Sequence, residues 1–252
     1  MKRLFASTFA VLMFCAASGV VHAEAVKIAI EGAYPPFNAV DSKNQLNGFD
    51  VDIAHALCSK MKADCTLVAQ DWDGMIPGLM AKKYDAIVSS MVVTKERQQK
   101  VSFTNRYYRT RLAISVAKNS TLNSMKPDAF KGLTVGAQSS TTQGTYAQDV
   151  LGAAGATVKL YPSQDDANLD LAAGRLDAVV NDKFPNLDWL AKDGKDCCKL
   201  LGEVSGNDDD VAIAVRKDDN GLRERFNKAI ADIIADGTYQ RISSHYFKSS
   251  IY

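Results

Sequence analysis

Apolar and polar residues follow one another along this chain in blocks that predict strands and helices in turn. Val26 to Ile30 and Ala86 to Val88 are short apolar runs bounded by turn or polar residues, which is the pattern of buried strands. Between them, apolar residues recur every four positions from Phe49 to Met61 and predict a helix that packs one face on a sheet. A strand at Thr66 to Ala69 and a helix at Met75 to Lys83 complete this unit. The alternation predicts an α/β fold with mixed, mostly parallel sheets flanked by helices.

The same block occurs twice. LMAKKYDAIVSS, from Leu79 to Ser90, and LAAGRLDAVVND, from Leu171 to Asp182, match in residue type at almost every position, 92 residues apart. Each predicts the end of a helix, a basic turn, an apolar strand and a polar pair. We therefore expect two lobes of related build. Since open α/β sheets bind ligands at the carboxyl ends of their strands, the two polar pairs predict a site between the lobes.

The C-terminal segment predicts how the lobes are joined. Asn220 is expected to cap a helix that Gly237 ends, and a shorter helix carries Ile242, Tyr246 and Phe247. No strand and helix remain to build a third lobe, so this segment should return to the first. We expect a two-strand hinge, with crossings near residues 109–112 and 208–211. The predicted division is a signal peptide at 1–23, a first lobe at 24–112 and 207–252, and a second lobe at 113–206.

The first 23 residues differ from the rest. Lys2 and Arg3 precede an apolar run from Leu4 to Ala17, and small residues stand one and three positions before a cut after Ala23. This is the pattern of a secretory signal peptide, and the run is shorter than the roughly 20 residues of a membrane span. Its removal leaves 28 basic and 29 acidic residues, which excludes the basic footprint of a nucleic-acid-binding protein. We expect a periplasmic protein.

Four cysteines remain in the mature chain, and an exported protein meets an oxidising compartment. Cys58 and Cys65 lie at the end of a predicted helix and in the turn after it, and a disulfide between them should stabilise the fold by roughly 2.5 kcal/mol. A metal site is disfavoured because no CxxC pair or neighbouring histidine accompanies them. Cys197 and Cys198 are adjacent, and the sequence leaves their pairing open.

Three polar residues near the first repeat indicate an anion site. Ser89 and Ser90 end a predicted strand, and Arg97 follows seven residues later, where its guanidinium could hold a carboxylate through two hydrogen bonds. The loop from Ser139 to Gln143 precedes a predicted helix, so its backbone N–H groups could also receive an anion. The alternative is ordinary surface chemistry, in which serines cap turns and an arginine is solvated.

Several motifs together resemble a known family. They are GAYPPF, LNGFDVDIAHALC with Cys65 after it, DWDGMIPGL, KYDAIVSSMVVTKERQQKVSFT, the STTQ loop, AGRLDAVVND and DGTYQRISSHYF. In order and spacing they resemble the periplasmic solute-binding proteins (family 3) of polar amino acid ABC transporters. The likeness is greatest to the lysine/arginine/ornithine- and histidine-binding group and looser to opine-binding proteins. It implies a two-lobed type II fold, a membrane permease as partner, a monomer and no cofactor.

The resemblance also implies roles for single residues at the amino acid end of the ligand. Arg97 matches the arginine that holds the α-carboxylate, and the loop residues Thr141 and Thr142 assist it. Asp182 matches the acid that receives the α-ammonium, with Ser89 and Ser90 contributing. Physical chemistry agrees, because a zwitterion taken out of water needs both charges paired. For Asp182 the alternative is a helix cap.

The side-chain end of the ligand is implied in the same way. Glu31 matches an acid for a distal cation, and Tyr34 and Trp72 match aromatic rings around its stem, where a cation–π contact adds about 0.5–2 kcal/mol. The alternatives are a solvated turn for Glu31 and core packing for the rings. Val92 departs from the family, which usually has serine there, so only its backbone can serve. Glu31 and Trp72 are larger than the commoner aspartate and phenylalanine, which would also fit an arginine-derived opine.

Two other functions compete with ligand capture. The same fold is known to host a cyclohexadienyl dehydratase, and a binding domain can also serve as a sensor. The mature chain has only His55 and His245, neither near a predicted site loop, and no zinc-ligand, phosphate-loop or nucleophile-elbow motif. The expected function is binding of arginine, lysine, ornithine or histidine and delivery to a permease, without an enzymatic step, a metal or a cofactor.

Overall fold

The structure, a computed structural model, describes residues 24–206 and 209–252 and contains two five-stranded sheets and one three-stranded sheet. The predicted signal peptide, at 1–23, and residue 208 of the predicted return crossing lie outside the described residues. The first sheet has the order β5-β1-β6-β13-β7 and the second β10-β9-β11-β8-β12, while β2-β3-β4 form the small one. None of the helices described is long and apolar enough to cross a membrane.

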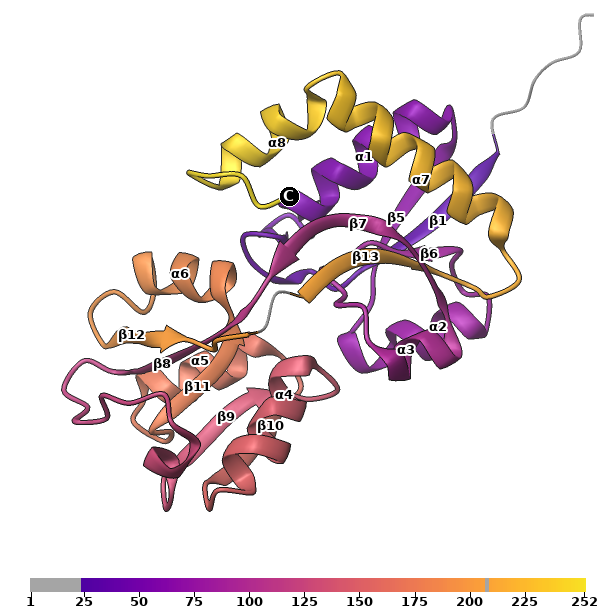
Figure 1. The fold of residues 1–252 in the computed structure, drawn as a ribbon. Helices are drawn as coiled ribbons and strands as arrows, with labels where there is room; N and C mark the ends of the chain where they lie inside the picture. The colour runs from indigo at the N-terminus through magenta and orange to yellow at the C-terminus, as the bar shows by residue number, and fades with distance from the viewer. Residues whose placement is uncertain (1–23, 207–208) are drawn as a thin grey trace, which may run out of the picture.

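The first sheet is parallel across β5, β1 and β6 and antiparallel at β13 and β7. Ile28, Ile30 and Val88 belong to its core, and α1, α7 and α8 pack beside one another over one face (Figure 1). The expected apolar spacing of α1 places Phe49, Ile53 and Leu57 in this core. The elements of this part are β1 (Ala25–Ile30), β5 (Asp64–Ala69), β6 (Ala86–Ile87), β7 (Ser102–Thr110), β13 (Asp209–Val215), α1 (Phe49–Met61), α2 (Met75–Met80), α3 (Lys95–Lys100), α7 (Asn220–Ala235) and α8 (Thr238–Tyr246).

The second sheet repeats the first in its parallel half. Strand β9 lies between β10 and β11, as β1 lies between β5 and β6. Both β6 and β11 follow a short helix; β11 ends in its polar pair, whereas Ser89 and Ser90 come two and three residues after β6. Strands β8 and β12 add the antiparallel half. The elements are β8 (Leu112–Ala117), β9 (Thr134–Gln138), β10 (Thr157–Tyr161), β11 (Ala178–Asp182), β12 (Cys198–Glu203), α4 (Thr142–Tyr146), α5 (Gln164–Ala172) and α6 (Lys183–Ala191). Shorter segments are β2 (Ala33–Tyr34), β3 (Asn38–Val40), β4 (Leu46–Asn47), the 3-10 turns η1 (Trp72–Gly74) and η2 (Pro127–Phe130), and the π-helical η3 (Ala147–Gly152).

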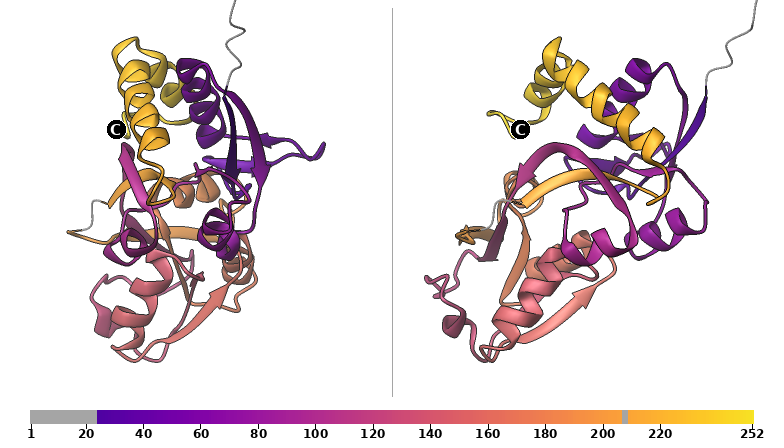
Figure 2. Two further views of the ribbon diagram at one scale, coloured as in Figure 1. Left: turned by 90° about the vertical axis from the view of Figure 1, so that its right-hand side faces the viewer. Right: turned by 45° about the vertical axis from the view of Figure 1, so that its right-hand side comes forward.

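The chain passes between the two sheets twice. Strand β7 ends at Thr110 and β8 begins at Leu112, so the outward passage needs a single residue, and the return runs from Glu203 to Asp209 (Figure 1). Leu112 packs in the core of the second sheet. Two further views show the C-terminal helices beside the N-terminal segment and the middle of the chain forming a separate body below them (Figure 2). The C-terminal segment therefore returns to the first lobe.

Local signals set most helix boundaries, with two differences from the sequence pattern. The cap of α7 is Asp219, whose Oδ1 accepts a hydrogen bond from Leu222 N at 3.2 Å, so the expectation of an Asn220 cap was wrong by one residue. A carboxylate at this position also interacts favourably with the helix dipole. Helix α2 ends at Met80, short of Lys83, because Lys82 takes a left-handed conformation with φ of 58°.

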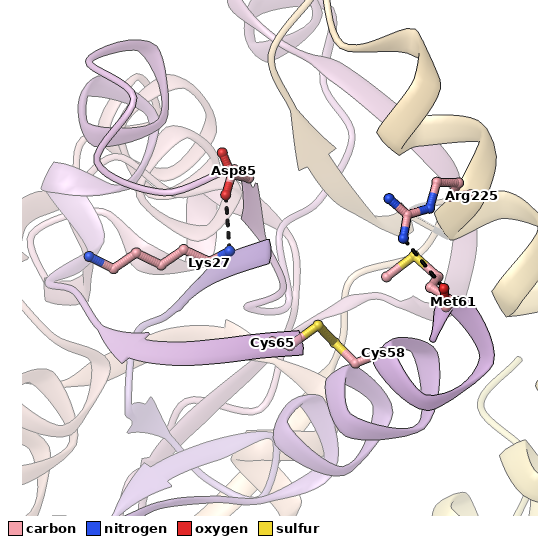
Figure 3. Close-up of a disulfide and its surroundings, with 6 residues drawn as sticks. All are labelled: Lys27, Cys58, Met61, Cys65, Asp85 and Arg225. Atoms are coloured by element: carbon pink, nitrogen blue, oxygen red, sulfur yellow. Dashed lines mark hydrogen bonds between the residues drawn. A yellow bond between two sulfur atoms is a disulfide. The ribbon is translucent and has the colours of Figure 1, made fainter. Parts of the chain in front are cut away.

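Two pairs of cysteines among the described residues are bonded. The predicted disulfide between Cys58 and Cys65 is confirmed, with an S–S distance of 2.02 Å, and it ties the last turn of α1 to β5 (Figure 3). Nearby, Arg225 of α7 donates a hydrogen bond to the carbonyl of Met61 at 3.4 Å. Cys197 and Cys198, whose pairing the sequence left open, are bonded to each other.

Candidate ligand-binding site

One narrow cavity between the lobes is lined by every site residue that the sequence predicted. Its wall also includes Gln138, which the sequence did not predict, and Gln143, which ends the predicted loop but had been given no role of its own. The first lobe contributes the segments after β1, β5 and β6 together with α3, and the second contributes the ends of β9 and β11 and the start of α4. The predicted residues that meet here are Glu31, Tyr34, Trp72, Ser89, Ser90, Val92, Arg97, Thr141, Thr142 and Asp182.

Arg97 is held from both lobes. Its backbone N–H donates a hydrogen bond of 3.1 Å to the hydroxyl of Thr94, the residue that caps α3. Its guanidinium donates to the carbonyl of Val92 at 2.8 Å and, across the cavity, to the carbonyl of Ser140 at 3.0 Å. Burial lowers the pKa of Arg97 to about 10, so it stays charged at neutral pH. Only 9% of the residue is exposed, which excludes the alternative of a solvated surface arginine. No described carboxylate forms an ion pair with its guanidinium.

Asp182 supplies the opposite charge. It occupies the cap position of α6, but its side chain makes no capping hydrogen bond, so the helix-cap alternative is not what the structure shows. The Tyr34 hydroxyl lies 2.8 Å from Asp182 Oδ2 and 3.0 Å from Asn181 Oδ1, and it accepts from Gln143 Nε2 at 3.0 Å. Asp182 Oδ1 is buried and has no hydrogen-bond partner among the described residues. Burial raises the pKa of Asp182 to about 7.

Glu31 brings a second carboxylate to the cavity. It follows β1 directly, and its backbone N–H donates to Ser89 Oγ at 2.9 Å. Its Oε1 accepts from Gln138 Nε2 of the other lobe at 2.6 Å. Burial raises the pKa of Glu31 to about 7, with the Gln138 hydrogen bond acting in the opposite direction. The residue is nearly enclosed, which removes the alternative of a solvated turn.

A buried carboxylate beneath the cavity fixes Ser90. Asp50, in the first turn of α1, accepts hydrogen bonds from Asn38 Nδ2 and Ser90 Oγ, both at 2.8 Å, and from Tyr107 Oη at 2.7 Å. The Tyr107 hydroxyl also accepts from the backbone N–H of Ser90 at 3.0 Å. Ser90 has a φ of 51°, a conformation that non-glycine residues adopt at a cost. This network therefore holds the end of β6 in a strained shape that faces the cavity.

The Thr141 and Thr142 loop and Trp72 form the remaining wall. Thr141 caps α4, since its Oγ1 accepts from Gly144 N at 3.0 Å and donates to the carbonyl of Gln138 at 2.7 Å. Trp72 packs in an apolar cluster of the first lobe, as the core-packing alternative expects. It also reaches the cavity, where its Nε1 donates to the Ser140 carbonyl at 3.0 Å and its ring lies 5.2 Å from the Arg97 guanidinium carbon.

The cavity thus combines one buried cation with two buried carboxyl groups, whose pKa values of about 7 leave them partly ionised at neutral pH. An unpaired charge in such a place is costly, and each group here has only neutral hydrogen-bond partners. A ligand with one carboxylate and two cationic groups would pair all three. Chemically, the arrangement can bind and enclose such a ligand.

The family model for bacterial extracellular solute-binding proteins, family 3, matches residues 26–249. The chain belongs to this family. Its two mixed sheets with two connections form the two-lobed type II fold of periplasmic binding proteins.

Relatives of this solute-binding protein cover nearly all of it. It is 44% identical over 232 residues to the L-arginine-binding protein of Pseudomonas aeruginosa, across 90% of this chain and 89% of that one. It is 36% identical to the histidine-binding periplasmic protein of Escherichia coli, across 100% and 99%. Among solved structures, an ancestral arginine-binding protein bound to arginine has a TM-score of 0.84 at 32% identity, covering 88% of this chain and 98% of that one.

Four residues that build the site were missed from the sequence. Gln138 and Gln143 line the cavity, while Asp50 and Tyr107 hold Ser90 from below. Gln143 lay within the predicted loop, so its position alone gave a signal. Asp50, Tyr107 and Gln138 had no such signal, because the role of a single buried polar residue inside a helix or strand is visible only once its partners from distant segments are known.

Proposed function

We propose that this protein binds a cationic L-amino acid in the periplasm and delivers it to the permease of an ABC transporter. One observation carries the proposal: Arg97 and Asp182, buried charges of opposite sign from different lobes, line the same cavity. In the proposed complex Arg97 binds the α-carboxylate and Asp182 the α-ammonium, with Oδ1 of Asp182 available as an unused acceptor.

The second acid decides the class of amino acid. A neutral amino acid would pair Arg97 and Asp182 and leave Glu31 enclosed without a cation. Because burial already raises the pKa of both acids to about 7, a bound cation stabilises their ionised forms and lowers both pKa values. Tyr34 and Trp72 line the same cavity and would contact the stem that leads to the distal cation. A ligand with three charges is therefore favoured over one with two.

Binding is proposed to couple to closure of the lobes. Residues 24–112 with 207–252 would move against residues 113–206 about the two connections, and the closed monomer would dock on the permease. Hydrogen bonds from Tyr34 to Asp182 and from Arg97 to Ser140 already cross between the lobes. The proposed periplasmic location is supported by the Escherichia coli relative, whose name describes that relative as a periplasmic protein.

The position of the histidines supports binding without turnover. His55 on α1 and His245 on α8 are exposed and are not part of the cavity wall. Hydrogen bonds among the polar groups of the cavity hold Arg97, Asp182 and Glu31 in place. A bound amino acid can pair with these three groups without any covalent bond of the ligand being broken. We propose that the protein is a binder and not a dehydratase.

Titration calorimetry against a panel of ligands tests the proposal. The panel contains arginine, lysine, ornithine, histidine, glutamine, glutamate and an arginine opine, each added to the mature protein at pH 7.5. The expected result is tight binding of cationic amino acids and weak or no binding of glutamate. Heat from glutamate without heat from arginine would contradict the role of Glu31. Tighter binding of the opine than of arginine would move the function to opine capture.

A further inference from the structure

Gln138 is a buried residue at the end of β9, and the proposed function gives its side-chain amide no role. Its Nε2 donates to Glu31 Oε1 at 2.6 Å and to the backbone carbonyl of Pro162 at 3.2 Å. A side-chain amide has two N–H donors, and both are used here. The opposite orientation of the amide would place its oxygen against two acceptors, so these partners fix which atom is which.

The hydrogen bonds leave two acceptors at this end of the cavity. The carbonyl oxygen Oε1 of Gln138 is the amide's remaining group, and Glu31 Oε2 receives no hydrogen bond from the described side chains. One acceptor belongs to each lobe, and the hydrogen bond between the two residues sets their relative position. No cationic side chain of the protein pairs with Glu31 among the described residues.

We infer that Gln138 determines specificity by making this end of the cavity select a guanidinium over a primary ammonium. The inference rests on the proposed function. A guanidinium carries five donors in a rigid plane, so it can reach a carboxylate and a separate amide oxygen together. A primary ammonium carries its three donors on one nitrogen, so it reaches both oxygens only where they lie close to a single point, and its main partner is the carboxylate of Glu31. Gln138 should therefore add affinity for arginine and little for lysine or ornithine.

A different role for Gln138 makes a different prediction. Its hydrogen bond to Glu31 joins the two lobes, so it could serve only as a latch for the closed form. A latch would affect every ligand equally, since all of them bind between closed lobes. The ratio of arginine affinity to lysine affinity distinguishes the two roles, whereas the affinity for either ligand alone does not.

The test uses Gln138→Met, which keeps the length of the side chain and removes both its acceptor and its N–H donor to Glu31, with Gln143→Met as a matched control. Gln143 lines the same cavity but bonds the Tyr34 hydroxyl beside Asp182, where all amino acids are alike. Calorimetry with L-arginine and L-lysine at pH 7.5 is performed on wild type and both variants. Loss of the donor to Glu31 weakens both ligands alike, so Gln138→Met should weaken arginine about 10- to 100-fold more than it weakens lysine. Gln143→Met should weaken both ligands by the same factor.

Equal weakening of arginine and lysine by Gln138→Met, or no weakening of arginine, would overturn the inference. Wild-type protein that binds neither ligand would instead overturn the proposed function. Should Gln138→Met not fold, Gln138→Asn moves the amide back by one methylene and is expected to lower the same affinity ratio. A melting curve of each variant establishes that it is folded before titration.

Discussion

Replacing Asp182 by asparagine should stabilise the ligand-free protein while destroying its function. The carboxylate is buried, and its Oδ1 has no hydrogen-bond partner among the described residues. Burial raises its pKa from the ordinary 3.8 to about 7. Asparagine has the same shape and can still accept from the Tyr34 hydroxyl, which lies 2.8 Å from Asp182 Oδ2. Removal of the charge therefore relieves an unfavourable interaction without opening a cavity.

The pKa gives the sign and the size of the effect. The unfolded chain loses the Asp182 proton near pH 3.8 and the folded chain near pH 7, so the folded state binds more protons between these values. The contribution of Asp182 to stability consequently falls as pH rises through that window, and the full penalty is present above pH 7. At 1.36 kcal/mol per pKa unit the penalty is at most about 4 kcal/mol. Between pH 5 and pH 8 the advantage of Asp182→Asn should grow by about 2–3 kcal/mol.

Urea denaturation of ligand-free wild type and Asp182→Asn at pH 5 and pH 8 measures this advantage. Subtracting the free energy of unfolding of wild type from that of the variant removes the contribution of every titrating group that the substitution leaves unchanged. Calorimetry on the same samples should show arginine affinity reduced by about 30-fold or more, since truncating one member of a buried charge pair costs about 2–5 kcal/mol. An advantage that is the same at pH 5 and pH 8 would refute the account of a buried, ionisable Asp182.

Three further variants test other parts of the structure. Arg97→Ala should abolish binding of every amino acid in a calorimetric titration, because all share the α-carboxylate, and retained micromolar affinity would count against its role. Glu31→Gln should weaken arginine and lysine far more than glutamine in the same assay; equal losses would show that Glu31 is structural. Replacing both Cys58 and Cys65 by serine should lower the free energy of unfolding by roughly 2–3 kcal/mol in urea denaturation and leave arginine affinity unchanged. A change in affinity would mean that the disulfide shapes the site.

The sequence predicted the elements whose signals are local. Apolar runs predicted β1 and β5, and apolar residues at every fourth position predicted α1. Burial of one face of a helix requires apolar residues at regular intervals, so the pattern is visible in the sequence. The exact cap of α7 was missed, since Asp219 and Asn220 are both good caps and only the backbone decides between them. The small sheet of β2, β3 and β4 was also missed, because its strands are two or three residues long and carry no periodic pattern.

The residues of the site divide in the same way, into those with a local sequence signal and those whose role depends on distant partners. Ser89, Ser90 and Asp182 could be found because they repeat at equivalent strand ends, and strand ends meet at one edge of a sheet. Gln138 could not be found, because its significance is a hydrogen bond to Glu31, 107 residues away in the sequence. Asp50 shows the same limit, since its three side-chain partners come from β3, the end of β6 and β7.

A crystal structure of the protein with L-arginine bound tests the central claim most directly. The account predicts that the α-carboxylate lies on the Arg97 guanidinium, the α-ammonium on Asp182 and the ligand guanidinium between Glu31 and Gln138, all within hydrogen-bonding distance. Arginine bound in the reverse direction, or bound elsewhere with Arg97 and Asp182 untouched, would contradict it.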